Sequence, residues 1–228
     1  HELVARAAEL GYHALAITDE CSVAGIVRAW EAARDLDMTL LVGAEFRFED
    51  QAVVVLAENR QGYAQLCRMI TLARRRAPKG HYRLDWEELS GLEDCLLLYD
   101  PAGSDDRCAY RMAWLKQHYP GRSWVMLLRH FDAGEEVRHH HTVTMAKRLG
   151  LPLVAAGGVL MHQAARKRLQ DVLTALRGAH AAAGVPVRHF EADSWWYFKG
   201  NGSTGESGGV QEWMPRPDAL PGGFGALA

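Results

Sequence analysis

The chain has 228 residues and a mass of 25.3 kDa, enough for one large domain or two small ones with a well-buried core. Its apolar content of 48% and charged content of 24% exclude wholesale disorder and a fibrous repeat. The net charge of -2 excludes nucleic-acid binding driven by an overall positive field, so any contact with DNA needs a local basic patch. No apolar run approaches the roughly 20 residues that span a bilayer.

Short apolar runs alternate with amphipathic stretches along most of the chain. This alternation predicts βα units around a mainly parallel sheet. About six such strands favour either a closed or nearly closed barrel or an open doubly wound sheet, and the pattern does not choose between them. In chain order we predict helix 2–10, strand 14–18, helix 23–35, strands 38–48 and 52–58, helix 60–76, strand 95–99, helix 106–119, strand 123–128, helix 134–149, strand 151–157 and helix 162–177.

The last 50 residues differ in composition from the rest. They contain 9 of the 22 glycines and 4 of the 8 prolines, and the stretch 200–209 has no apolar residue. Such composition is typical of an irregular tail, although a small docked segment is an alternative. We therefore place one domain at 1–178 and a Gly/Pro-rich tail at 179–228.

The cysteines and the first residues indicate the kind of chain. Cys21, Cys67, Cys95 and Cys108 form no C-x-x-C pair, so we expect reduced and mostly buried thiols in a cytosolic protein rather than a zinc ribbon. The sequence starts with His1 in a helical pattern, without an initiator Met or a signal peptide. We therefore expect a fragment that lacks its true N-terminus.

Acidic residues and histidines follow several of the predicted strands. Asp19 follows the first strand, Glu45 lies near the end of the second, and His130 follows the strand at 123–128. Because functional residues of parallel βα folds gather at the C-terminal ends of the strands, these side chains are candidate ligands for zinc, manganese or iron. A metal there would activate a water molecule for ester hydrolysis.

Each candidate also has an ordinary structural interpretation. Asp19 could cap the following helix, Glu45 could pair with Arg47 on an exposed strand, and His130 could be a loop residue. The run His139–His141 resembles a metal-binding tract but fits a solvated helix face better. The basic cluster Arg74–Arg76 is either a solvated helix end or a contact for DNA or a neighbouring domain.

Several sequence blocks together resemble one family. The chain is similar to the PHP (polymerase and histidinol phosphatase) domain at the N-terminus of bacterial error-prone DNA polymerases, which are paralogues of the polymerase III alpha subunit. The resemblance covers roughly residues 1–177 in the order of the family. It is carried by ALAITDECSVAGIVRAWEAA (14–33), LLVGAEFRF (40–48), NRQGYAQLCRMIT (59–71), RRRAPKGHYRL (74–84), LPLVAAGG (151–158) and LQDVLTALR (169–177).

The resemblance implies an α/β fold: a distorted TIM-like (β/α)7 barrel that is incomplete here because its first strand is missing. The first strand of metal-binding relatives carries an H-x-H ligand pair, which this chain therefore lacks. The family's ligand positions match Asp19, Glu45 and, more loosely, His130. Gly158 and Leu160 stand where relatives have an Asp and a His, so we expect a divalent metal such as Zn or Mn to bind weakly or not at all.

The function implied by the resemblance is that of a translesion polymerase involved in DNA replication and repair in the cytoplasm. This region is expected to support the enzyme without containing its polymerase active site, with DNA and the other polymerase domains as partners. One alternative is a metal-dependent phosphoesterase on the same barrel. Another is a module that binds single-stranded DNA through Arg74–Arg76 and the aromatic residues of the tail. An open barrel edge also predicts self-association of the fragment.

The tail does not resemble the continuation found in the family. The composition changes abruptly near residue 178, where the family would continue toward the polymerase palm. We therefore expect residues 179–228 to be a non-native continuation, produced by a reading-frame error or a chimeric gene.

Overall fold

A computed structural model describes residues 2–101, 105–129, 134–182, 197–199 and 210–215. The chain divides into two compact units, His1–Arg166 and Lys167–Ala228, and each is described by itself. The first unit contains the mixed α/β fold that the sequence pattern predicts. The domain boundary proposed at residue 178 stays a prediction.

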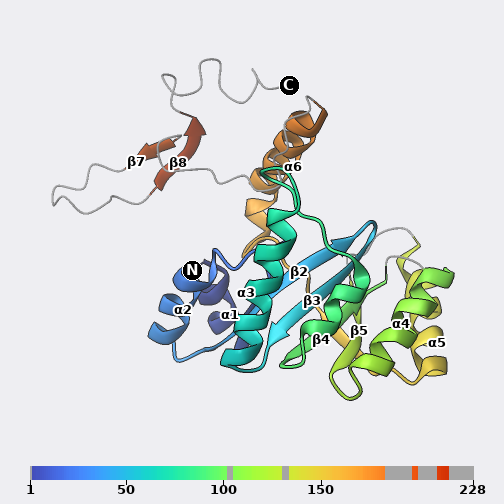
Figure 1. The fold of residues 1–228 in the computed structure, drawn as a ribbon. Coiled ribbons are helices and arrows are strands. Elements are labelled where there is room, and N and C mark those ends of the chain that lie inside the picture. Colours follow the sequence, from blue (N-terminus) through green and yellow to red (C-terminus); the bar gives the residue numbers. More distant parts are fainter. Residues whose placement is uncertain (1, 102–104, 130–133, 183–196, 200–209, 216–228) are drawn as a thin grey trace. The chain divides into compact units, whose positions relative to one another are not determined.

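The first unit is built on one six-stranded sheet that curls into a half-barrel (Figure 1). The strands lie in the sheet in the same order as in the chain, and β1 and β6 form its two edges. An open sheet of this shape confirms the expected incomplete barrel. The strands are β1 (Ala14–Ile17), β2 (Thr39–Phe48), β3 (Gln51–Ala57), β4 (Cys95–Asp100), β5 (Ser123–Leu128) and β6 (Leu153–Ala156).

Strand β3 runs against all its neighbours. It pairs antiparallel with both β2 and β4, whereas β1–β2, β4–β5 and β5–β6 are parallel pairs. Only Glu49 and Asp50 separate β2 from β3, and Glu49 has a left-handed φ of 62°. A connection this short permits a hairpin but no crossover helix, so the chain must reverse its direction.

Helices cover the sheet between its strands. Figure 1 shows α3 lying across β2, β3 and β4, with which it is in contact, while α1 and α2 lie at the β1 side and α4 and α5 at the β5 side. All the helices predicted from the pattern are present within the described ranges. They are α1 (Glu2–Glu9), α2 (Ile26–Asp35), α3 (Arg60–Arg75), α4 (Asp106–His118), α5 (Glu135–Leu149) and α6 (Lys167–Ala182); the short 3-10 helices η1 (Trp86–Gly91) and η2 (Ala164–Arg166) are additional.

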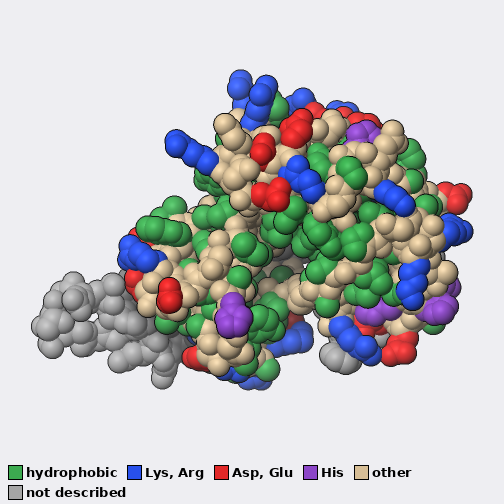
Figure 2. Space-filling view, turned by 90° about the horizontal axis from the view of Figure 1, so that it is seen from below, with side chains coloured by type: hydrophobic (Ala, Val, Ile, Leu, Met, Phe, Trp, Pro, Cys, Tyr) green, Lys and Arg blue, Asp and Glu red, His purple; other side chains and the backbone are tan. Residues whose placement is uncertain are grey.

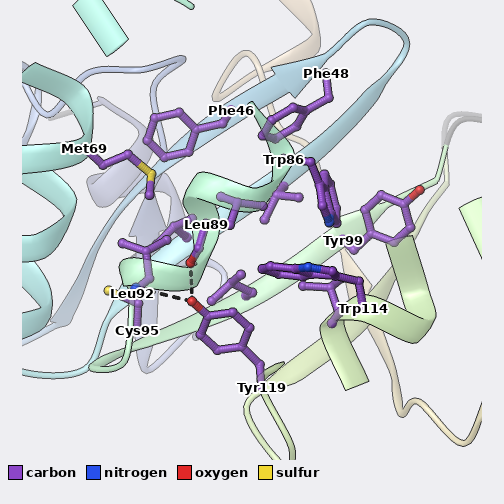
Figure 3. Packing of buried hydrophobic residues seen from close by; sticks show 14 of the residues in the cluster. Phe46, Phe48, Met69, Trp86, Leu89, Leu92, Cys95, Tyr99, Trp114 and Tyr119 are labelled. Atoms are coloured by element: carbon purple, nitrogen blue, oxygen red, sulfur yellow. Dashed lines mark hydrogen bonds between the residues drawn. The ribbon is translucent and has the colours of Figure 1, made fainter. Parts of the chain in front are cut away.

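The main hydrophobic core lies between the sheet and helices α3 to α5. Figure 3 shows its aromatic centre, where the Trp86 ring meets Phe48, Tyr99 and Trp114 edge to face, with centroids 5.0, 5.6 and 5.9 Å away. Trp86 comes from η1, which the pattern did not predict. Edge-to-face pairs of this kind add stability beyond the buried area alone.

Tyr119 ties η1 to the core through hydrogen bonds. Its hydroxyl donates to the carbonyl oxygen of Leu89 and accepts from the backbone N–H of Leu92 at 3.3 Å (Figure 3). Both leucines are fully buried. The phenol thus satisfies two backbone groups that have no access to water.

A second, smaller core lies under α1 and α2. These two helices bury small side chains against β1 and β2, which allows a close approach. Its buried members are Val4, Ala7, Ala29, Ala33 and Met38.

The start of α3 requires a glycine. Asn59 caps the helix by accepting from the backbone N–H groups of Gln61 and Gly62, and its amide also donates to Asp94. A Cβ atom at Gly62 would lie 2.0 Å from the carbonyl oxygen of Asp94. Only glycine lets the helix approach the loop before β4 this closely.

The second unit comprises α6 and a two-stranded antiparallel ribbon, β7 (Tyr197–Lys199) with β8 (Val210–Pro215). The tail aromatics Tyr197, Phe198 and Trp213 belong to these strands, and Trp195 and Trp196 lie outside the described residues. Among the helices described in both units, none has the length and apolarity that a membrane crossing requires.

The four cysteines are mostly buried, as the sequence predicts, whereas the cytosolic setting stays a prediction. All four thiols are free, three of them are buried, and Cys67 is half-buried.

Candidate functional site

The predicted site residues Asp19 and Glu45 meet where β1 ends beside β2. The backbone N–H of Glu45 donates to the carbonyl oxygen of Asp19 at 3.1 Å, and the N–H of Cys21 donates to the carbonyl oxygen of Glu45 at 2.8 Å. Glu20 thereby forms a parallel bridge with Glu45, in the register that β1 and β2 already share. The strand ends therefore bring the backbones of Asp19 and Glu45 together, but Glu20 rather than Asp19 is the bridge partner of Glu45, so the side chains of Asp19 and Glu45 do not share a face. Their joint use as ligands stays a prediction.

The side chain of Asp19 lies against the first turn of α2. A Cβ atom at Gly25, the N-cap position, would be 2.9 Å from Asp19 Oδ2. The N-cap residue is Gly25, which has no side chain to cap the helix, so Asp19 lies beside this helix end without being its N-cap residue. The helix dipole still favours a carboxylate at this end.

A strained turn follows Asp19 and is held by an arginine from α3. Cys21 is buried and has a φ of +47°, a conformation that costs a non-glycine residue about 1 kcal/mol. Arg74 donates from Nε and Nη2 to the carbonyl oxygen of Cys21 at 3.2 and 3.1 Å, and from Nη2 to that of Glu20 at 3.2 Å. These charged hydrogen bonds stabilise the turn that places Glu20 beside Glu45.

Tyr82 extends the hydrogen-bonding of β2 beyond the end of β1. Its hydroxyl accepts from the backbone N–H of Arg47 at 2.8 Å and donates to Glu20 Oε1 at 3.0 Å. Its ring packs edge-on against Phe46, and the Arg74 guanidinium lies over it, 5.5 Å from the centroid. Burial, and secondarily the neighbouring carboxylate of Glu20, raise the pKa of Tyr82, so the phenol stays protonated and can donate.

The charge on Glu45 is balanced by Arg47. The Nε of Arg47 lies 2.8 Å from Glu45 Oε1, as the alternative interpretation of Glu45 predicted. Burial nevertheless raises the pKa of Glu45; Arg47 opposes this shift, and the charges of Glu20 and Asp100 add to it. Two further carboxylates thus act on Glu45, whose own carboxylate is bonded to one guanidinium.

The described groups do not fit a metal ion. Within residues 2–101, 105–129 and 134–176, no three His, Cys, Asp or Glu side chains lie close enough together to share one. The carboxylate of Glu45 is bonded to Arg47, and that of Glu20 accepts from Tyr82. His130 lies outside the described residues, so the ligand set of Asp19, Glu45 and His130 stays a prediction.

The loop after β6 has a glycine and a leucine at the two positions that the resemblance matches to an Asp and a His. Gly158 has a left-handed φ of 55°, and Leu160 is 70% exposed. The nearby His162 lies with its Nδ1 3.3 Å from Glu2 Oε2, and Arg166 bonds the other oxygen of the same carboxylate. His162 therefore joins this loop to α1.

The basic cluster Arg74–Arg76 is not a uniform solvated patch. Arg74 points inward to the Cys21 turn, whereas Arg75 and Arg76 are both exposed and Arg76 pairs with Glu88. On the face that Figure 2 shows, Lys and Arg side chains of the described residues are interspersed with Asp and Glu. The DNA-binding module based on the cluster stays a prediction.

Sequence reasoning missed the roles of Glu20, Arg74 and Tyr82. The block 74–84 was recognised as part of the resemblance, but its contact with residues 20 and 21 was not foreseen. One signal was available in the sequence. An arginine and a tyrosine stand in the block 74–84 that is shared with the family, although a plain helix end requires neither residue type.

The chain is similar to known proteins over most of its length. The family model for the PHP domain matches residues 1–134, more than half of the chain. The error-prone DNA polymerase of Pseudomonas aeruginosa is 49% identical over 178 residues, and that of Alkalilimnicola ehrlichii is 45% identical over 186 residues. These alignments cover 77% and 81% of this chain but only 17% and 18% of the relatives, so the chain spans about a sixth of their length.

A solved structure supports the fold. A candidate metal-dependent phosphoesterase from Bifidobacterium adolescentis superposes with a TM-score of 0.50 at 16% identity, covering 71% of this chain and 81% of that one. At this identity the likeness concerns the fold alone. The sequence blocks, the half-barrel sheet and the match over residues 1–134 agree, and the chain belongs to the PHP domain family.

Proposed function

We propose that this chain is the PHP region of an error-prone DNA polymerase and that it supports the polymerase without adding nucleotides itself. The observation that carries the proposal is the 45–50% identity to curated error-prone DNA polymerases over more than three quarters of the chain. The partners are then the remaining polymerase domains and, through them, damaged template DNA. The enzyme would act in the cytoplasm, in DNA replication and repair.

The side-chain contacts at the strand ends support a structural role. Phosphoryl transfer by polymerases uses two metal ions held by carboxylates. Here the carboxylate of Glu45 is bonded to Arg47 and that of Glu20 to Tyr82. Of the candidate ligands, Glu45 is therefore bonded to an arginine of the protein instead.

A segment exchange tests the proposal. The aligned segment of the Pseudomonas aeruginosa polymerase would be replaced by that of this chain, and primer extension across an abasic template would be measured. We expect extension to be retained in the chimera and to be absent from the purified 228-residue chain. Template-dependent incorporation by the chain alone, or a folded chimera without activity, would contradict the proposal.

A phosphoesterase assay separates the alternative function. The purified chain would be incubated with p-nitrophenyl phosphate and MnCl2 or ZnCl2, beside the variant Asp19→Ala. We expect the same background rate for both proteins. Hydrolysis by the wild type that disappears in Asp19→Ala would favour the metal-dependent phosphoesterase over the structural role.

A further inference from the structure

The carboxylates at the end of β2 share one face of the sheet. Glu20 and Glu45 form a bridge pair, and residues paired across neighbouring strands point to the same face. Arg47 and Asp100 are both register partners of Ala52 on β3, one from each side. Arg47 and Asp100 therefore lie on a common face two strands apart, about 10 Å at the usual strand spacing.

Two contacts hold Arg47 at this end of β2. Its backbone N–H donates to the Tyr82 hydroxyl, and its Nε lies 2.8 Å from Glu45 Oε1. The side chain of Glu45 is only 25% exposed, so its charge is partly removed from water. A carboxylate in this position needs a nearby cation or a shared proton.

We propose that the Arg47 guanidinium takes the place of a metal cation beside Glu45, while Tyr82 binds Glu20 on the same face, so that protein groups alone hold this strand end together. A guanidinium is charged at every accessible pH and presents its donors in a fixed plane. Because it is tethered to the strand that carries Glu45, a divalent ion would have to displace it and would be repelled while it remains. The proposal concerns the chain itself and does not depend on its role in the polymerase.

Arg74 and Tyr82 complete this arrangement. Arg74 holds the turn that carries Glu20, and the hydroxyl of Tyr82 bridges Glu20 to the backbone of Arg47. Both residues come from the segment 74–82, which starts at the last turn of α3. Arg47, Arg74 and Tyr82 thus hold Glu20 and Glu45 in place without a metal ion.

The test compares metal responses of the purified 228-residue chain and its variants. Melting temperature would be measured with EDTA, MnCl2 or ZnCl2, and binding of Mn²⁺ and Zn²⁺ by titration calorimetry. We expect the wild type to melt at the same temperature under all three conditions and to bind neither ion at this site. Arg47→Ala should melt several degrees lower, and Mn²⁺ should restore part of the loss because the carboxylate of Glu45 then lacks its cation.

Control variants keep the outcome unambiguous. Arg107→Ala removes another half-exposed arginine of the first unit, paired with Glu49, and should not gain a metal response. The double variant Glu45→Gln/Arg47→Ala removes both charges, so its melting temperature should equal or exceed that of Arg47→Ala. If Arg47→Ala alone does not fold, the double variant replaces it in the comparison. Metal binding by the wild type that is lost in Glu45→Gln, or an Arg47→Ala variant that behaves like Arg107→Ala, would overturn the proposal.

Discussion

Arg74 donates two hydrogen bonds to the carbonyl oxygen of Cys21, a residue that lies 53 positions earlier in the chain and has a left-handed backbone. The contact joins the last turn of α3 to the turn after β1. It makes Arg74 part of the support of the candidate site, although the sequence pattern places it in an ordinary basic helix end.

Replacement of Arg74 should destabilise the first unit. Arg74→Ala leaves the carbonyl groups of Glu20 and Cys21 without their charged donor, and we expect a loss of about 1.5–3 kcal/mol in the free energy of unfolding. Arg74→Lys keeps the charge but not the planar fork and should lie between. Urea denaturation followed by circular dichroism measures the effect.

The adjacent Arg75 offers a matched control. It has the same side chain on the same helix but is exposed. Arg75→Ala should change the free energy of unfolding by no more than about 0.5 kcal/mol. Equal losses in the two alanine variants would show that the contacts of Arg74 add nothing.

Gly62 should tolerate no larger residue. In Gly62→Ala the new Cβ meets the backbone oxygen of Asp94, which cannot move without breaking its hydrogen bond from Glu58 N–H. We expect a loss of about 3 kcal/mol, which outweighs the gain of about 1 kcal/mol in helix propensity. Gly91→Ala, where nothing lies within 4 Å of the added atom, should be neutral or slightly stabilising in the same thermal melt.

The Tyr119 hydroxyl should contribute to stability in a pH-dependent way. Tyr119→Phe leaves the buried backbone groups of Leu89 and Leu92 unpaired, at a cost of about 1–3 kcal/mol near neutral pH. Burial raises the pKa of Tyr119 to about 12, above its ordinary value of 10.0. The unfolded chain therefore loses this proton first, and the contribution falls as the pH rises from 10 to 12.

Unfolding titrations at pH 8, 10 and 11.5 check this dependence. The difference between the wild type and Tyr119→Phe should shrink toward the alkaline end. Tyr110→Phe is the control, because Tyr110 is exposed and its removal should leave the pH profile of the wild type unchanged. A constant difference at all three pH values would refute the ionisation argument.

Thiol labelling should distinguish the four cysteines. Cys21, Cys95 and Cys108 are at most 1% exposed, and burial raises the pKa of the Cys95 thiol to about 12, so these thiols should resist a disulfide reagent at pH 8. Cys67, half-buried on α3, should react alone in the folded chain. Native labelling followed by mass spectrometry would show one modified site, and none in Cys67→Ser; labelling of Cys95 before unfolding would contradict the burial.

Hydrophobic periodicity was sufficient to locate the elements of the first unit. The run 95–99 and the alternating pattern at 38–48 appear as β4 and β2 within one residue of their predicted limits. The direction of β3 was less evident, because it depends on the turn at Glu49 and Asp50 rather than on the strand itself. The helix η1 was missed because its core contacts come from a few residues without a helical repeat.

The candidate site was predictable only in its backbone. Strand ends of a βα fold had to bring Asp19 and Glu45 together, and they do so through backbone hydrogen bonds. The long-range contacts of Arg74 and Tyr82 produce no repeating pattern in the sequence. In the sequence alone, an arginine that bonds a carbonyl oxygen 53 residues away cannot be told from any other basic residue at a helix end.

The strand order of the sheet has a consequence for how this protein can be made and shortened. Because each strand lies beside the one that precedes it in the chain, the sheet can grow from one edge during synthesis, without waiting for distant segments to arrive. Trimming the first unit from either end peels away an outer strand and leaves the remaining pairings untouched. Successive deletions from either end should therefore lower the stability of the first unit in steps rather than unfold it at once.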